Sequence, residues 1–165
     1  MLMHQGLGLE TFNDLPRRKA VHALYECCCS VAWASRVADG RRYRSRADLF
    51  SVADAELTEL SDGDVDSLAA TLPEPSKVCA AMDTDTRAAL GTAARAYEDR
   101  FGYPYASSRL FEPEGFEPRD ILVDLGHRLD NDDQTERKIM RDELAKINHT
   151  RLDRLLGPEG GWPQY

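Results

Sequence analysis

The sequence lacks several features that would define its class at once. No apolar segment reaches the roughly 20 residues of a membrane-spanning helix, so a membrane partner is not expected. The chain does not begin with a basic region followed by an apolar stretch, so we expect a cytoplasmic protein without a secretory signal. Acidic residues outnumber basic ones by 29 to 21, which argues against a nucleic-acid partner because phosphate binding needs a basic face.

Cysteine is scarce and unevenly placed. Three of the 4 cysteines are consecutive, at Cys27, Cys28 and Cys29, and the fourth is Cys79. Adjacent helical positions point to different faces, so this triplet cannot form the tetrahedral site of a Cys-x₂-Cys pair. We therefore predict no metal site, and thiols that pack as small apolar groups in a reducing compartment.

What the sequence does contain is helical periodicity. Hydrophobic residues make up 42% of the 165 positions, and their spacing follows the period of a helix rather than that of a strand. Caps and breakers predict helices over residues 9–13, 16–28, 30–38, 46–60, 62–72, 84–101, 118–129 and 133–156. We predict an all-α, single-domain bundle of seven or eight helices over residues 1–165, with residues 1–8 and 157–165 as loose tails.

Several short motifs occur in an order that identifies a family. The motifs are Phe12-Asn13-x-Leu15-Pro16, Cys27-Cys28 with Trp33, the segment from Tyr97 to Tyr105, Arg128-Leu129-x-Asn131-Asp132 with Glu136, and Ile147 with Arg151-Leu152. Each motif alone is weak, but their order and spacing together are specific. From Leu9 to Leu156 the chain resembles the 2-oxo-4-hydroxy-4-carboxy-5-ureidoimidazoline (OHCU) decarboxylase family.

The resemblance implies an activity. Members of the family release CO₂ from an unstable acid of urate oxidation and give (S)-allantoin, without a metal or organic cofactor, and the resemblance suggests a homodimer. Their chemistry uses a His-Pro motif, a Glu-Gln pair after a serine, a late arginine for the carboxylate, and backbone amides after the aromatic segment. A histidine suits the step because loss of CO₂ leaves a carbanion that must receive a proton.

The stretch that should carry the catalytic motifs departs from the family pattern. Leu72 stands before Pro73 where the histidine is expected, and no histidine occurs between positions 22 and 127. Ser76 is kept, whereas Cys79 and Ala80 occupy the positions of the Glu-Gln pair. We therefore predict Glu74 and Cys79 as catalytic proton donors and Pro73 and Ser76 as substrate contacts. The alternatives are an exposed loop for Glu74 and a packing role for Cys79.

Arg151 is the predicted carboxylate-binding residue. It lies in the apolar stripe of the last helix, where an unpaired guanidinium would be costly, and its planar fork suits a carboxylate. The alternative is an ion pair with one of three acidic residues, Asp120, Asp124 or Glu136. His149 lies about 160° from Arg151 around the helix, so we do not expect it to be catalytic.

A second wall of the pocket is predicted after the aromatic segment. Ser107, Ser108 and Arg109 place two hydroxyl groups and a cation where the family resemblance implies substrate-binding amides. The alternative is an ordinary surface loop.

Three functions are compatible with these residues. The preferred one is a diverged lyase of specialised metabolism that acts on a small carboxylic acid, heterocyclic or not, other than the urate-pathway intermediate. The second is a weak OHCU decarboxylase, because a lost acid–base group costs about 10²–10⁴ in rate. The third is a non-catalytic relative that binds a ligand or a partner protein. A fold alone cannot decide between them.

Overall fold

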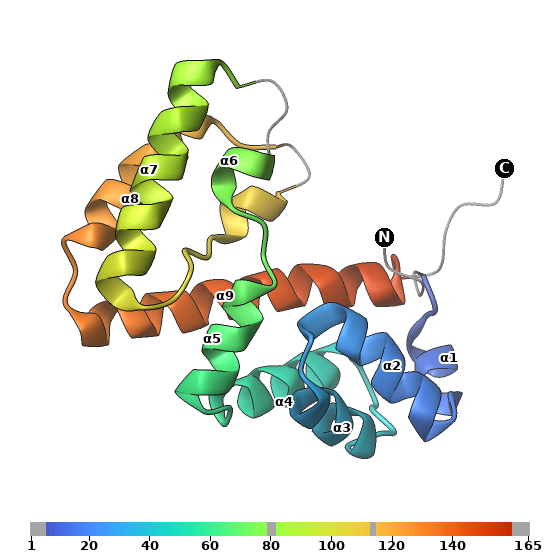
Figure 1. Cartoon of the computed structure of the whole chain (residues 1–165). Helices are drawn as coiled ribbons and strands as arrows, with labels where there is room; N and C mark the ends of the chain where they lie inside the picture. The colour runs from blue at the N-terminus through green and yellow to red at the C-terminus, as the bar shows by residue number, and fades with distance from the viewer. Residues whose placement is uncertain (1–5, 79–81, 113–114, 160–165) are drawn as a thin grey trace, which may run out of the picture. The chain divides into compact units, whose positions relative to one another are not determined.

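A computed structural model describes residues 6–78, 82–112 and 115–159. The described chain is all-α and contains no strand, which confirms the predicted fold class (Figure 1). Its helices are α1 (Leu9–Asp14), α2 (Arg17–Cys28), α3 (Val31–Asp39), α4 (Arg46–Thr58), α5 (Asp62–Ala70), α6 (Pro75–Val78), α7 (Thr84–Phe101), η1 (Ser108–Phe111, a 3₁₀ turn), α8 (Pro118–Leu129) and α9 (Asp133–Leu156).

Each helix predicted from the sequence is present, and two short ones were missed. The helix predicted to reach Leu72 ends earlier, at Ala70, and α6 begins only five residues later at Pro75. Both α6 and η1 have four residues, which is too short for a hydrophobic period to become visible in the sequence.

The chain divides into two compact units. The first consists of residues 1–64 and 148–165 and the second of residues 65–147. The prediction of a single domain stays a prediction. No described helix combines the length and the apolar character that crossing a membrane requires.

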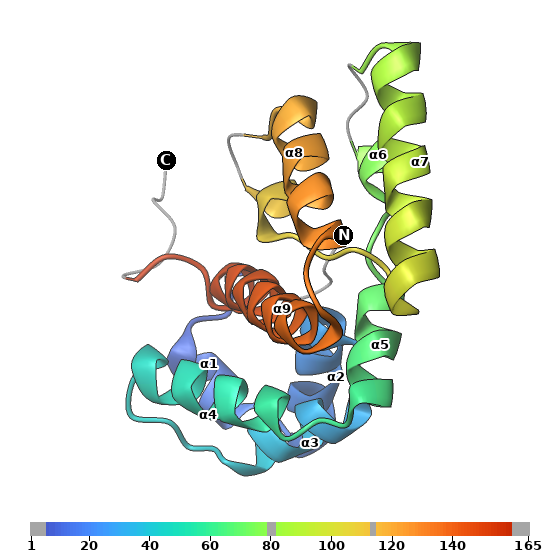
Figure 2. The same ribbon diagram turned by 90° about the vertical axis from the view of Figure 1, so that its left-hand side faces the viewer.

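The first unit is built around α3, which packs against α2 and α4 (Figure 2). Ser30 caps α3 by accepting a hydrogen bond from the Trp33 amide, and the buried Trp33 indole donates to the Ala53 carbonyl at 2.9 Å. At the end of α9, the carbonyl oxygens of residues 154–156 accept hydrogen bonds from the amides of residues 6–8. These bonds satisfy groups that have no partner within the helix.

In the second unit, α7 packs against both α6 and α8 (Figure 1). Asp83 caps the start of α7, and Gly102, with φ +83°, ends it in the left-handed conformation. A buried ion pair lies beside this helix, with Arg128 Nε 2.6 Å from Glu136 Oε1. The same carboxylate accepts a short hydrogen bond from the Tyr97 hydroxyl. Burial of these charges is tolerable because each one has a partner.

Candidate functional site

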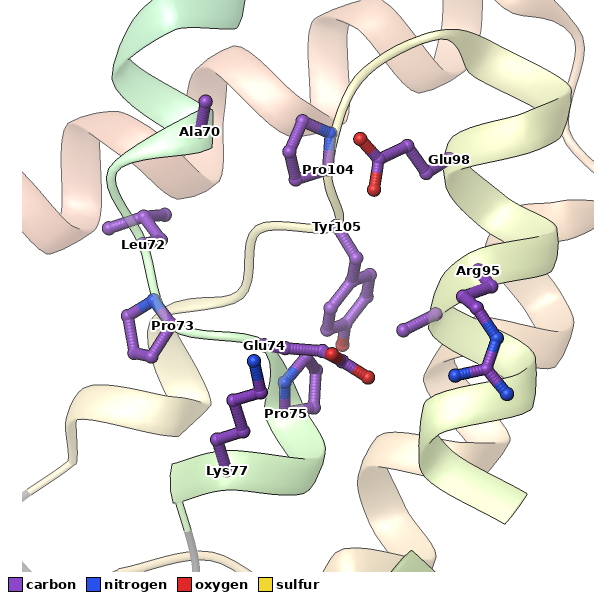
Figure 3. A pocket seen from close by; sticks show the side chains of 11 residues that line it. Ala70, Leu72, Pro73, Glu74, Pro75, Lys77, Arg95, Glu98, Pro104 and Tyr105 are labelled. Atoms are coloured by element: carbon purple, nitrogen blue, oxygen red, sulfur yellow. The ribbon is translucent and has the colours of Figure 1, made fainter. Parts of the chain in front are cut away.

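The second unit contains a pocket of about 320 Å³ (Figure 3). Its walls are the connection from α5 to α6, the middle of α7, and the segment that follows α7. The lining residues are Ala70, Leu72, Pro73, Glu74, Pro75, Lys77, Ala94, Arg95, Glu98, Pro104 and Tyr105. The stretch that lacks the expected histidine therefore forms one wall of a pocket.

Glu74 is the predicted catalytic residue that this pocket contains. Its side chain is half-buried, and its Oε1 accepts a hydrogen bond from the Ser76 hydroxyl at 2.9 Å. Ser76 is only 8% exposed, and its carbonyl accepts a hydrogen bond from the Arg87 guanidinium on α7 at 2.5 Å. Ser76 is thus held by α6, to which it belongs, and by Arg87 of α7, and its hydrogen bond fixes the position of the Glu74 carboxylate.

Arg95 provides a positive charge on the α7 side of the pocket. Figure 3 shows the Glu74 carboxylate pointing toward α7, where Arg95 lies. Among the described residues, Arg95 Nη2 donates to the Thr92 hydroxyl at 3.5 Å, and no ion pair joins Arg95 to Glu74. Both charged groups border the same space, because a Cβ on Gly91 would lie 3.4 Å from Glu74 Oε1 and 3.5 Å from Arg95 Nη1.

The remaining polar groups balance the charge of the pocket. Lys77 and Glu98 are exposed, so the lining contains two cations and two carboxylates. Tyr105 is buried and its hydroxyl donates to Asp124 Oδ2 at 2.5 Å. Burial, followed by this hydrogen bond, raises the pKa of Tyr105, so its hydroxyl stays protonated as a neutral donor. Such a pocket suits a ligand that combines an anionic group with a hydrogen-bond donor.

The predicted second wall does not line this pocket. Ser107 is buried, and its hydroxyl accepts a hydrogen bond from the Arg109 amide at 3.3 Å. The Ser108 amide donates to Glu143 Oε2 at 2.6 Å, while the Arg109 side chain is exposed. These contacts are internal to the second unit, so the binding roles of Ser107, Ser108 and Arg109 stay predictions.

Arg151 belongs to the first unit. Its Nη1 donates to the Cys27 carbonyl at 2.9 Å, and its side chain is half-buried. Two of the acidic residues considered as its partners are engaged within the second unit, Glu136 with Arg128 and Asp124 with the Tyr105 hydroxyl. The carboxylate-binding role of Arg151 stays a prediction.

Cys79 and His149 are the two remaining residues for which the sequence predicted or excluded a catalytic role. Cys79 lies outside the described residues, so its predicted role is not tested. His149, which we did not expect to be catalytic, lies in the first unit with Nε2 2.7 Å from Asp54 Oδ1 and its ring stacked on Phe50. These contacts give His149 a structural partner. Within residues 6–78, 82–112 and 115–159, no three His, Cys, Asp or Glu side chains are grouped closely enough to hold a metal ion.

Sequence reasoning missed the α7 side of the pocket. Arg95 lines the pocket from a helix whose hydrophobic spacing was used only to predict a buried face, and Gly91 lies beside Arg95 on the same helix. The available signal was Gly91, because a glycine inside a helical pattern is unfavourable and so calls for a packing or functional reason. Nothing in the spacing connects Arg95 to Glu74.

The all-α fold and the order of the sequence motifs agree with the class of the ureidoimidazoline decarboxylases. A family model described as OHCU decarboxylase matches residues 13–153, and the chain belongs to this family. The resemblance predicted from the motifs is thereby confirmed. No curated protein matches the chain by sequence.

Solved structures of two proteins share the fold. The crystal structure of an (S)-allantoin synthase superposes with a TM-score of 0.71 at 14% identity and covers 90% of this chain. The chain spans only 54% of that protein's length. The crystal structure of an OHCU decarboxylase determined in the presence of (S)-allantoin gives a TM-score of 0.70 at 17% identity, over 80% of this chain and 95% of that one.

Proposed function

We propose that the protein is a diverged, cofactor-independent lyase that releases CO₂ from a small carboxylic acid other than the urate-pathway intermediate, in a pathway of specialised metabolism. Family membership supports the type of reaction. The observation that carries the proposal is the arrangement of Glu74 and Arg95, which border one space at Gly91 without forming an ion pair. A carboxylate and a cation that do not neutralise each other are both available to a ligand.

The two groups have complementary tasks in such a reaction. When the bond to the substrate carboxylate breaks, CO₂ leaves and the electron pair moves into a neighbouring carbonyl or imine of the substrate. Arg95 binds at the acidic end of the substrate and there stabilises the negative charge that develops on the neighbouring group. The Glu74 carboxylate relays a proton, which it takes from solvent and transfers to the carbon, so that it ends the step as a carboxylate again. Ser76 orients Glu74 through the hydrogen bond between their side chains.

Arg151 is retained in the proposal as a residue that binds a substrate carboxylate. Its match to the family's late arginine supports this role, and so does the suitability of a guanidinium for a carboxylate. If Arg151 has this role, Arg151→Ala lowers turnover or ligand affinity. If both are unchanged and the protein is as stable as before, Arg151 does not bind the substrate.

The test is CO₂ release from a panel of small acids in which the carbon that bears the carboxylate lies next to a carbonyl or imine carbon, such as 3-oxo acids. For any acid that the wild type decarboxylates, Glu74→Gln should lower kcat by about 10²–10⁴, because it removes the proton donor. Arg95→Gln should also lower kcat/KM. The matched control is Arg119→Gln, since Arg119 is an exposed arginine on α8 that does not line the pocket.

The parent reaction is measured with the same variants. Freshly oxidised urate supplies the family's substrate, and the appearance of optically active allantoin is followed by circular dichroism. We expect a rate close to the spontaneous one, because the family's histidine is absent. A strong acceleration would show a retained OHCU decarboxylase and overturn the proposal. If no acid in the panel releases CO₂ faster than without protein, the non-catalytic alternative is favoured.

A further inference from the structure

Gly91 occupies a position where a helix would normally carry a side chain. It lies in the middle of α7, is buried, and has ordinary helical backbone geometry. Glycine is less favourable than alanine inside a helix, because it loses more backbone freedom on folding. Gly102 has φ +83°, a backbone conformation that favours glycine, whereas Gly91 does not have a positive φ. Something other than backbone conformation must therefore account for this glycine.

The surroundings of Gly91 supply a reason. A Cβ placed there would lie 3.4 Å from Glu74 Oε1, 3.5 Å from Arg95 Nη1 and 3.9 Å from Ser76 Oγ. These are ordinary contact distances, so an alanine methyl group would fit without a clash. It would occupy the space that the three polar groups share.

We propose that Gly91 is a specificity-determining residue, whose missing side chain leaves room for a compact anionic group held between Arg95 and Glu74. The guanidinium of Arg95 binds the anionic group of the ligand. The carboxylate of Glu74 accepts a hydrogen bond from an O–H or N–H beside that group. The ligand is therefore a compact acid with a donor next to its carboxylate.

Helix α8 offers a matched control. Gly126 is also a glycine inside a helix of the second unit, but nothing lies within 4 Å of a Cβ placed there. Replacing either glycine with alanine favours the helix to a similar degree. Only the change at Gly91 adds a methyl group beside Glu74 and Arg95, so comparison of the two variants separates ligand recognition from helix stability.

The experiment is a titration of the full chain with glycolate, followed by NMR chemical shifts of the backbone amides. Glycolate has a carboxylate next to a hydroxyl donor, and acetate lacks the donor. We expect glycolate to shift the amides around Gly91 and Arg95, and acetate to bind several-fold more weakly. Gly91→Ala should weaken glycolate binding at least tenfold and Gly126→Ala should leave it unchanged, while each raises the melting midpoint by roughly 2–4 °C.

Several results would overturn the inference. Unchanged glycolate binding by Gly91→Ala would show that the space is not used, and a lower melting midpoint would show that Gly91 serves tight packing. Arg95→Gln changes an exposed residue, so its effect on glycolate binding can be measured with little risk to folding. If Arg95→Gln and Arg119→Gln bind glycolate equally well, the inference is also contradicted. The inference rests on the pocket of the proposed function but not on turnover. Binding without any decarboxylation would overturn the proposed function and leave Gly91 as a specificity residue.

Discussion

Cys27 and Cys28 show how position in the fold controls the chemistry of a single residue. Their side chains lie at the end of α2 and are 1% and 6% exposed. Burial raises the pKa of both thiols to about 12, and Arg151 opposes this shift without overcoming it. Because the thiolate is the reactive form, both side chains are inert at neutral pH and act as apolar packing groups. Cys29 follows them and is partly exposed.

Alkylation distinguishes these thiols. In folded protein treated with iodoacetamide at pH 8, we expect Cys27 and Cys28 to stay unmodified and Cys29 to react. Trypsin cleaves after Lys19 and Arg36, so the mass of the peptide 20–36 reports the number of labels. One label is expected in the folded protein and three after unfolding in urea. Three labels without denaturant would contradict the burial of the pair.

The pH dependence of stability follows from the same thiols. Their folded pKa of about 12 is raised, so the folded state holds protons that the unfolded state loses above a pKa of about 8.5. Their contribution to stability is complete below that pH and decreases as the pH rises toward 12.

At the scale of an element, Glu143 anchors η1 to α9 within the second unit. Its Oε2 accepts a hydrogen bond from the Ser108 amide at 2.6 Å, at the start of η1. Burial alone would raise the pKa of Glu143, but the hydrogen bond from Ser108 and the charge of Lys146 lower it. The charged form of Glu143 is therefore favoured by folding.

Glu143→Gln should lower the free energy of unfolding by about 1 kcal/mol at pH 7, because it removes a charge-assisted hydrogen bond. Because folding lowers the pKa of Glu143, its charge stabilises the folded protein fully above the unfolded pKa of about 4.3. This contribution is lost as the pH falls through the folded pKa. The difference between wild type and variant should therefore shrink in acid. Urea unfolding at pH 7 and pH 3 measures it, with Asp142→Asn, an exposed neighbour on α9, as the control. A pH-independent difference would exclude the charge as the cause.

At the scale of the whole molecule, the predicted single domain can be tested through its buried ion pair. Arg128 and Glu136 are 3% and 0% exposed and belong to the second unit, and α9 contributes residues to both units. Glu136→Gln removes the nearer carboxylate partner of the buried guanidinium and leaves only Asp124 Oδ2, 3.7 Å from Arg128 Nη1, so it should cost about 3–5 kcal/mol.

For one cooperative domain, the loss of stability is shared throughout the chain. Hydrogen exchange should then show amides of residues 6–64 losing protection together with those of residues 65–147. Loss confined to residues 65–147 would show that the chain contains two domains. Asp142→Asn again serves as a control, because it leaves the ion pair intact.

Local features of the sequence determined the helices and their ends. Ser30 and Asp83 cap α3 and α7 by accepting hydrogen bonds from amides of the first turn, and Gly102 ends α7 at positive φ. Such signals act over about four residues, which is why they are visible in the chain itself. The family was also predictable, because its motifs keep their order along the sequence.

Only the tertiary structure decided which residues share the pocket. Glu74 was predicted as a site residue, but its neighbours Arg95 and Gly91 are brought to it by the packing of α6 against α7. In the same way, the Ser108 amide donates to Glu143, 35 residues away, and no local feature of the sequence predicts this pair. Contacts between residues that are far apart in the sequence depend on which amphipathic helices bury their apolar faces against one another. The hydrophobic period of one helix shows which face is buried but not which helix covers it.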